Sequence, residues 1–415
     1  MEDVLYDYII VGAGIAGLHC ALRLSKQFPK ARIALVESYS SPGGRIVTYT
    51  PPNSTVRWEA GAGRIHASHH RVLKYVKRYS LTLLPIDPES VWRSVGGTPE
   101  PNTWDSFADV LVQTLGLLEP AILASHTIEH LLLQLIGKEE TENLLQHFPY
   151  KSEVSLLRAD LALKAFAGEL GHSDQFFVVK EGLGELIRRM RAELMDARVQ
   201  LFLQHRLLTV TRPSADGVMT LHFEHTTPSL RTRHTILAVP RDSLAGIQPF
   251  PNLPVLRHIK SSPLLRTYAI FPKPTWHATL QKTVTNSPLR YIIPVGDAVM
   301  ISYTDGDDTG HWKTILDAEG VPALSKALVK EARRLFPKSS IPNPLFFKAH
   351  YWPDGAYYWL PGRYDPAAAS AAVRQPLPQK FPTLFVCGES YSLHQAWMEG
   401  ALEHADSMVE GFLLS

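Results

Sequence analysis

The stretch Tyr8-Ile9-Ile10-Val11-Gly12-Ala13-Gly14-Ile15-Ala16-Gly17 decides the fold of this chain. An apolar run typical of a buried β-strand leads into glycines at the first, third and sixth positions of a turn, and we predict a helix over residues 18–26. Gly12 permits a tight turn, Gly14 lets the backbone approach a pyrophosphate, and Gly17 lets helix and strand pack closely. The helix N-terminus would face the phosphates. We therefore predict a dinucleotide site that includes Gly12, Ala13, Gly14, Ile15, Ala16 and Gly17.

A second apolar run ends at Glu37, twenty residues after Gly17. A carboxylate at this place can accept hydrogen bonds from an adenosine ribose. Glu37 and Ser38 are followed closely by Gly43, Gly44 and Arg45, where the glycines allow close approach and the arginine offers a cation to a diphosphate. A domain that binds only NAD does not need this second element, whereas FAD enzymes often carry it. The sequence thus predicts FAD, with Glu37, Ser38, Gly44 and Arg45 among its contacts.

Composition describes an ordinary globular protein of 415 residues, long enough for two or three domains. Its 42 basic residues nearly balance 40 acidic ones and form no long run, so we expect neither a nucleic acid nor a membrane as partner. Cys20 and Cys387 are expected to be buried thiols, although one disulfide stays open. Without a basic leader or an apolar run of spanning length, we expect a cytoplasmic protein.

The order of elements predicts an α/β fold with a Rossmann-type FAD-binding domain, a mixed-sheet substrate domain and a helical insertion. Residues 1–70, 185–250 and 375–415 are assigned to the FAD-binding domain. Residues 71–184 are expected to be a largely helical substrate or lid region, because apolar residues recur there at helical spacing. Residues 251–374 are expected to form the substrate-binding mixed sheet. Within these parts we predict strand-like stretches over 199–210, 218–224, 232–239, 267–271, 291–294 and 298–303, and helices over 185–196, 322–336 and 398–413.

Further motifs follow the opening one in a fixed order: Gly43-Gly44-Arg45, Glu59-Ala60-Gly61-Ala62, Glu181-Gly182-Leu183, Ile236-Leu237-Ala238-Val239-Pro240, and Cys387-Gly388-Glu389 with Trp397-Met398-Glu399-Gly400-Ala401. In this order the chain resembles the flavin-containing amine oxidases over nearly its whole length. The resemblance implies that Glu37 holds the ribose, that Arg45 and Glu389 lie by the diphosphate and ribityl chain, and that the backbone of Leu207 meets the adenine edge. It also implies flavin contacts from Gly61, Ala62, Gly63, Arg64, Gly388, Trp397 and Met398.

The resemblance extends to the flavin ring itself. Trp397 and Met398 begin a predicted helix whose dipole would favour the anionic reduced isoalloxazine. Some members attach FAD through a cysteine where this chain has Ala356, so we expect non-covalent FAD.

Substrate-side residues are also implied by the resemblance. Tyr357 and Trp397 match the positions of an aromatic cage, and a core tryptophan is the alternative for Trp397. Arg64 matches the arginine that L-amino-acid oxidases of this family use on the substrate α-carboxylate, which suits a planar guanidinium. A structural arginine, paired with an acid or bound to flavin, is its alternative. Tyr291 could add a hydroxyl to the same carboxylate or pack in the core.

One position departs from the family pattern. Arg266 stands where many members have a lysine that holds a water near flavin N5, and an arginine cannot deprotonate. This departure puts a lysine-like role in oxygen handling in doubt. His66, His69 and His70 cluster without a nearby carboxylate or thiolate in sequence, so we interpret them as solvated or loop residues and predict no metal site.

Together these features predict FAD-dependent oxidation of an L-amino acid with a large apolar or aromatic side chain. The products would be a 2-oxo acid, ammonia and, with dioxygen as acceptor, hydrogen peroxide. A monoamine or polyamine oxidase is the nearest alternative. An amino-acid monooxygenase, a desaturase-like flavoprotein and a flavin-binding protein without catalysis also stay open, as does a homodimer.

Overall fold

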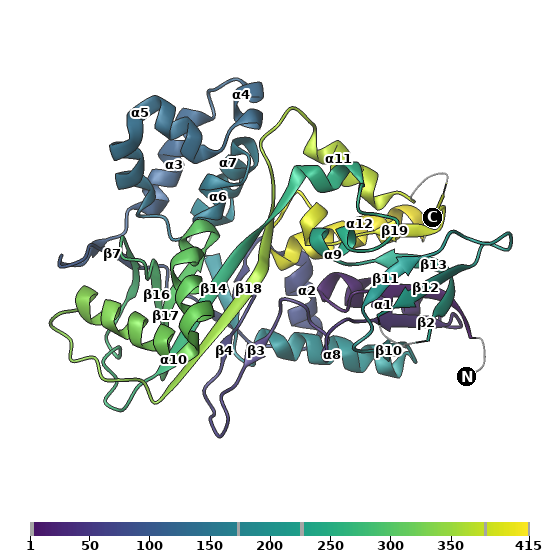
Figure 1. Ribbon diagram of the computed structural model, residues 1–415, viewed down its shortest axis with the longest axis horizontal. Coiled ribbons are helices and arrows are strands. Elements are labelled where there is room, and N and C mark those ends of the chain that lie inside the picture. Colours follow the sequence, from purple (N-terminus) through teal and green to yellow (C-terminus); the bar gives the residue numbers. More distant parts are fainter. Residues whose placement is uncertain (1–3, 172–174, 225–227, 377–379, 414–415) are drawn as a thin grey trace.

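The opening strand lies in a seven-stranded sheet whose central part is parallel (Figure 1). The computed structural model describes residues 4–171, 175–224, 228–376 and 380–413. Strands β10, β2, β1, β13 and β19 run parallel, while β12 and β11 continue antiparallel from β13. Because the carboxyl ends of parallel strands share one edge, the glycine turn and Glu37 come together there. The strands are β1 (Leu5–Val11), β2 (Ile33–Val36), β10 (Gln200–Phe202), β11 (Leu207–Val210), β12 (Met219–Phe223), β13 (Leu230–Leu237) and β19 (Leu384–Val386).

Two strands share one edge of β13. β12 pairs with residues 230–232, and β19 pairs with residues 235–237. The stretch 199–210, expected as one strand-like segment, is divided between β10 and β11, which lie at opposite edges of the sheet. Gln204 has a positive φ of 59° and turns the chain between them.

Side chains of β1 alternate between two hydrophobic clusters. Ile10 faces α1, α8 and α12, whereas Ile9 and Val11 face a cluster that includes residues of α9 and α11. α1 begins at Ile15, inside the glycine motif, rather than after it as expected. Cys20 and Cys387 are buried free thiols with sulfur atoms 3.8 Å apart. The helices are α1 (Ile15–Gln27), α8 (Leu183–Asp196), α9 (Arg241–Ala245), α11 (Pro366–Arg374) and α12 (Met398–Phe412).

A second seven-stranded sheet has the order β18-β14-β17-β16-β15-β7-β8. Its two longest strands, β14 and β18, cross the middle of the molecule in Figure 1, and α10 (Thr309–Leu335) covers part of the sheet. α10 starts before the predicted residue 322 and is kinked at Gly320. The strands are β7 (Ser90–Arg93), β8 (Glu100–Pro101), β14 (Ile259–Ile270), β15 (Lys282–Thr285), β16 (Tyr291–Val295), β17 (Ala298–Asp305) and β18 (Phe346–Trp359).

Strand β18 escapes sequence analysis because Pro353-Asp354-Gly355 is typical of a turn. In the structure these three residues form an irregularity opposite Pro263, since Ala356 pairs with Ser262 while Trp352 pairs with Leu264. The strand therefore continues through the break.

A group of helices, α3 to α7, is drawn at the upper left of Figure 1, above the second sheet. Residues 71–184 are not helical throughout, because β7 and β8 join the second sheet and two further strands form a three-stranded sheet with β5. Among the described residues, no helix combines the length and apolar character needed to cross a bilayer. The remaining elements are β3 (Thr48–Tyr49), β4 (Trp58–Glu59), β5 (Ile65–His66), α2 (His70–Arg78), β6 (Leu83–Pro85), α3 (Trp104–Leu115), α4 (Pro120–Ser125), α5 (Ile128–Leu145), α6 (Ser152–Ser155), α7 (Ala159–Ala167) and β9 (Phe176–Val179).

Candidate active site

The glycine turn between β1 and α1 leaves open space where phosphates would approach. Gly12 has φ of 99°, and a Cβ there would lie 2.4 Å from the carbonyl oxygen of Ala238. A Cβ on Gly17 would lie 1.8 Å from the carbonyl oxygen of Gly12, whereas one on Gly14 would meet nothing within 4 Å. The outer two glycines are thus required by packing. The middle one leaves room before the N-terminus of α1, which no side chain caps among the residues that the structure describes.

Glu37 is fixed beside this turn. Its carboxylate accepts hydrogen bonds from the backbone N–H of Ala13 at 2.8 Å and of Tyr39 at 2.9 Å. Ser38 Oγ donates to it at 3.1 Å. Glu37 and Ser38 line the same cavity as Gly12 and Gly14, which we call the first cavity. A carboxylate has lone pairs to spare for a ribose hydroxyl.

Arg45 and Glu389 form an ion pair in the wall of the first cavity. Arg45 Nη2 lies 2.7 Å from Glu389 Oε2, and Nη1 donates to the carbonyl oxygen of Gly355 at 3.1 Å. Glu389 also accepts from the backbone N–H of Ala396 at 2.7 Å. The irregularity in β18 thus helps to hold a cation at the place where a diphosphate was predicted.

The N-terminus of α12 also faces the first cavity. Trp397 is the N-cap residue and Met398 the first helical residue, and no side chain in the described part of the chain caps the free N–H groups. Both residues line the cavity, as does Ala356, whose methyl group offers no nucleophile for covalent attachment. The positive end of this helix dipole would stabilise an anionic group bound there.

Three predicted cofactor contacts lie outside the wall of the first cavity. Ala13 uses its N–H on Glu37, Gly17 packs against Gly12, and Leu207 is buried in the hydrophobic core. In this segment His205, and not Leu207, lies beside Glu37: the His205 backbone N–H donates to the Glu37 carbonyl oxygen at 2.8 Å. The predicted residues that line this cavity are Gly12, Gly14, Ile15, Ala16, Glu37, Ser38, Gly44, Arg45, Gly61, Ala62, Gly63, Arg64, Gly388, Glu389, Trp397 and Met398.

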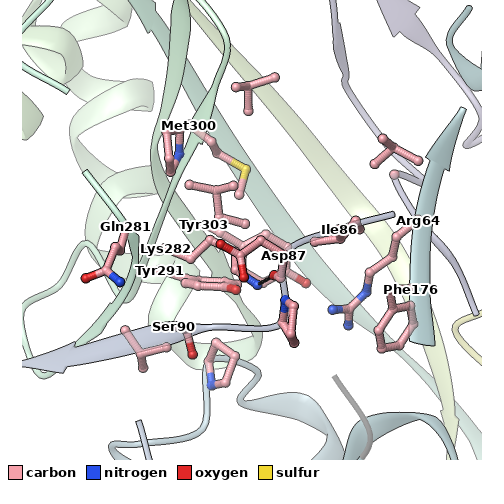
Figure 2. A pocket seen from close by; sticks show the side chains of 18 of the residues that line it. Arg64, Ile86, Asp87, Ser90, Phe176, Gln281, Lys282, Tyr291, Met300 and Tyr303 are labelled. Carbon is pink, nitrogen blue, oxygen red and sulfur yellow. Dashed lines mark hydrogen bonds between the residues drawn. The ribbon is translucent and has the colours of Figure 1, made fainter. Parts of the chain in front are cut away.

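Arg64 lies where the first cavity meets a second cavity of about 1220 Å³ (Figure 2). Three aromatic rings surround its guanidinium carbon, with centroids 4.3 Å away for Phe176, 4.9 Å for Tyr150 and 5.3 Å for Trp397. None of the acids in the described ranges forms an ion pair with Arg64. Its charge is therefore available to a ligand. The residues common to both cavities are Gly63, Arg64, Tyr150, Leu170, Arg266 and Tyr303.

Arg266 supports the loop that carries Arg64. Its Nη1 donates to the carbonyl oxygens of Gly61 and, at 3.4 Å, of Glu59. Two further donors hold the same loop, since Tyr268 bonds the Glu59 carbonyl at 2.8 Å and Trp352 bonds the next carbonyl at 2.7 Å. The guanidinium is thus engaged with backbone, which distinguishes it from a lysine that holds a water.

The family profile described as flavin containing amine oxidoreductase matches residues 15–409 of this sequence. The chain belongs to this family. The predicted fold class is confirmed, and the cofactor of this flavin-dependent amine oxidoreductase is FAD. The open space at Gly14, the fixed Glu37 and the two uncapped helix N-termini fit that cofactor.

Individual relatives cover the whole chain at low identity. The protein R188 of Acanthamoeba polyphaga mimivirus is 22% identical over 97% of this chain and 93% of its own length. A putrescine oxidase structure superposes with a TM-score of 0.76 at 17% identity, covering 99% of this chain and 100% of that one. A cyclohexylamine oxidase from Brevibacterium oxydans gives 0.75 at 17% identity over 98% and 99% of the two chains. These likenesses show a shared fold.

In this amine oxidoreductase Tyr357, predicted as a cage aromatic from the resemblance, lies outside the walls of both cavities. Tyr357 points into the hydrophobic core, with its ring 5.4 Å from the Arg45 guanidinium carbon, and does not line either cavity. The adjacent Tyr358 and Ala356 line the first cavity instead. Alternation along β18 explains the correction, because neighbouring side chains of a strand face opposite sides.

Tyr291 lies in the wall of the second cavity, as Figure 2 shows. Its ring is 6.2 Å from that of Tyr150, which also contacts Arg64. Burial raises the pKa of Tyr291, so its hydroxyl remains a hydrogen-bond donor. Tyr291 is largely buried and also lines the cavity. Packing in the core and offering a hydroxyl to a substrate carboxylate are therefore compatible roles.

The histidines after Arg64 were expected to be solvated or loop residues, and His69 does lie in a loop between β5 and α2. His66 and His69 are buried, and only His70 is exposed. Glu169, distant in sequence, lies 3.5 Å from His69 Nε2 and 2.8 Å from His394 Nε2.

The group of His69, Glu169 and His394 has the composition of a metal site, but its hydrogen bonds argue against one. His69 Nδ1 accepts from the backbone N–H of His66 at 3.1 Å, so the proton of the neutral ring is on Nε2, the nitrogen that would have to bind the metal. Burial alone would lower the pKa of His394, but Glu169 and Glu403 outweigh it and raise that pKa to about 10. The group is therefore an ion pair beneath Trp397, whose ring lies 5.0 Å from that of His69.

Proposed function

We propose that this flavin-dependent amine oxidoreductase oxidises the Cα–N bond of an L-amino acid with a large apolar or aromatic side chain. The observation that carries the proposal is Arg64, a cation that forms no ion pair with an acid among the described residues, at the junction of the two cavities. A planar guanidinium binds a carboxylate through two parallel hydrogen bonds, and an aliphatic amine has no such group.

Each residue at the junction then has a task. Arg64 binds the α-carboxylate, and Tyr291 offers a hydroxyl from the same cavity. Trp397 supplies a flat wall that excludes water from the amine. FAD, when bound, accepts the two electrons and hydrogen lost from Cα. Water then converts the imino acid to the 2-oxo acid and ammonia, and dioxygen is the proposed electron acceptor, giving hydrogen peroxide.

The second cavity supports a large side chain. Its volume of about 1220 Å³ exceeds the space that a small amino acid needs. Aromatic and aliphatic groups, among them Trp104, Phe148 and Leu280, contribute to its wall. Burying such a side chain would add about 2 kcal/mol of binding free energy.

Substitution of Arg64 tests the carboxylate role. We expect Arg64→Ala to cost about 2 to 5 kcal/mol in kcat/KM for the amino acid, roughly tens- to thousands-fold, because the ion pair would be buried. Arg188→Ala is the matched control, since Arg188 is 61% exposed and pairs with Glu185 on the outer face of α8. The measurement is steady-state kinetics together with flavin content. Equal kcat and KM for Arg64→Ala and the parent protein would remove this role.

Oxidation of a simple amine is the second candidate. It is favoured by the fold shared with a putrescine oxidase and a cyclohexylamine oxidase. The test compares anaerobic flavin bleaching by phenylalanine and tryptophan with bleaching by phenethylamine and tryptamine. The amino-acid proposal expects the carboxylate-bearing member of each pair to react at least tenfold faster. Equal rates would select the amine oxidase.

A further inference from the structure

Glu153 presents a carboxyl group in the wall of the first cavity that no role described above uses. Oε1 accepts a hydrogen bond from Tyr358 Oη at 2.9 Å. Oε2 is buried and has no hydrogen-bond partner among the described residues. Glu153 interacts electrostatically with Tyr150, Arg64 and Tyr303. These three residues line both cavities. The Glu153 carboxyl is thus near the junction of the two cavities.

We propose that Glu153 is the catalytic base that removes the proton of the substrate ammonium group before oxidation. The inference rests on the proposed oxidation of a Cα–N bond and holds for an amino acid or an amine. In this step an N–H bond of the ammonium breaks and an O–H bond forms on Oε2. The nitrogen keeps the electron pair, and the neutral amine can then lose hydride from Cα. The proton remains on Glu153 until solvent takes it up.

The other acids of the first cavity are already engaged. Backbone N–H groups bind Glu37, and Arg45 binds Glu389. Asp354, the remaining carboxylate of this wall, interacts with Arg45. The arginines at the junction cannot accept a proton. Among the described carboxyls of this wall, Glu153 is the one whose charge interacts with the junction residues Arg64, Tyr150 and Tyr303.

Neighbouring groups set the protonation of Glu153. Burial and then the negative charge of Asp305 raise its pKa to about 8, although its own backbone N–H, Tyr358 and Arg64 act in the opposite direction. Asp305 is fixed at the end of β17 because its oxygens accept from the N–H groups of Lys151 and Ser152, both at 2.8 Å. Tyr303 from β17 and Tyr150 complete the titratable surroundings. A base with a pKa near the working pH transfers protons efficiently.

The pH dependence of kcat/KM tests this assignment. In the parent protein kcat/KM should fall as pH drops through about 8, because Glu153 becomes protonated. Glu153→Gln should lower kcat/KM about 100-fold near pH 8. It should also abolish the acid limb of the profile, the fall of kcat/KM with falling pH, except for the part that reflects ionisation of the substrate. Tyr358→Phe should move the limb to higher pH, because it removes a donor that favours the carboxylate.

Tyr357→Phe is the matched control, because Tyr357 lies on the opposite face of β18 and its hydroxyl is buried without a hydrogen-bond partner among the described residues. Its profile should equal that of the parent protein. An unchanged limb in Glu153→Gln would overturn the proposal, and so would loss of FAD from that variant, which would make Glu153 a cofactor contact.

Infrared spectroscopy of the flavin-loaded protein without substrate gives an independent measurement. A protonated carboxyl band should titrate near pH 8 and be missing from Glu153→Gln; persistence of the band in that variant would contradict the assignment. Bleaching of the parent flavin by any amino acid or amine tests the oxidation itself. A parent protein that bleaches while Glu153→Gln keeps the limb therefore rejects the base alone, whereas a parent protein that no substrate bleaches rejects the oxidation.

Discussion

The two cavities meet at Arg64, yet they are built from different parts of the chain. The first is shaped largely by backbone: a turn with three glycines, two helix N-termini and a carboxylate held by N–H groups. The second is shaped by side chains of the second seven-stranded sheet, of β6 and β9, and of α3 and the connecting loops. Backbone geometry tolerates few residue types, whereas a side-chain wall can be changed one residue at a time. Single substitutions in the first cavity should therefore abolish stability or cofactor binding, whereas substitutions in the second should lower activity stepwise.

The largest effect is expected at Gly17, where the first cavity has no spare room. Gly17→Ala places a methyl group 1.8 Å from the Gly12 carbonyl oxygen, which must move. We expect a loss of about 3 kcal/mol in the free energy of unfolding and loss of bound FAD, measured by thermal unfolding and flavin absorbance. Gly310→Ala in α10 is the control, because a Cβ there meets nothing within 4 Å. A Gly17→Ala protein that is stable and yellow would break the comparison.

Arg266 offers an intermediate effect confined to the junction. Arg266→Met removes the donors to the Glu59 and Gly61 carbonyls, so the loop that carries Arg64 loses a support. Since hydrogen bonds from charged groups contribute about 1.5 to 3 kcal/mol, kcat/KM should fall roughly 10- to 150-fold while most of the FAD stays bound. Kinetics and flavin content on one preparation measure both. Release of FAD with unchanged turnover of the remaining holoenzyme would place Arg266 on the cofactor side.

The smallest effect concerns the ion pair beneath Trp397. The pKa of His394 is about 10 in the folded protein, above the ordinary value of about 6.5. The charged imidazole therefore contributes fully to the free energy of unfolding below about pH 6.5, and this contribution is lost as pH rises through about 10. His394→Gln should cost about 1 to 2 kcal/mol in the free energy of unfolding at pH 6 and much less at pH 10.5. Chemical denaturation of both proteins at the two pH values measures this. An equal cost at both would show that His394 acts without its charge.

The same contrast explains what sequence analysis could reach. The glycine turn and Glu37 lie within 30 residues and need only local rules, so their placement could be foreseen. Glu153 bonds to Tyr358 and Glu169 pairs with His394, each more than 200 residues away, and nothing in the sequence near the two acids indicates this. Tyr357 was matched to a cage position by the resemblance, and it does not line either cavity. Matching a motif does not give the parity of a strand, which decides which side chains meet the cavity, and the break at residues 353–355 hides that strand.

The shared edge of β13 bears on how the protein is made. β1, β2 and β13 are complete once residue 237 has been synthesised, but β19 and α12 come from residues 384–412. A chain emerging from the ribosome would therefore carry its glycine turn early and wait through about 150 residues before the last parallel strand docks. We expect nascent chains to acquire their prosthetic group only near the end of translation, which makes that interval the period of greatest exposure to misassembly.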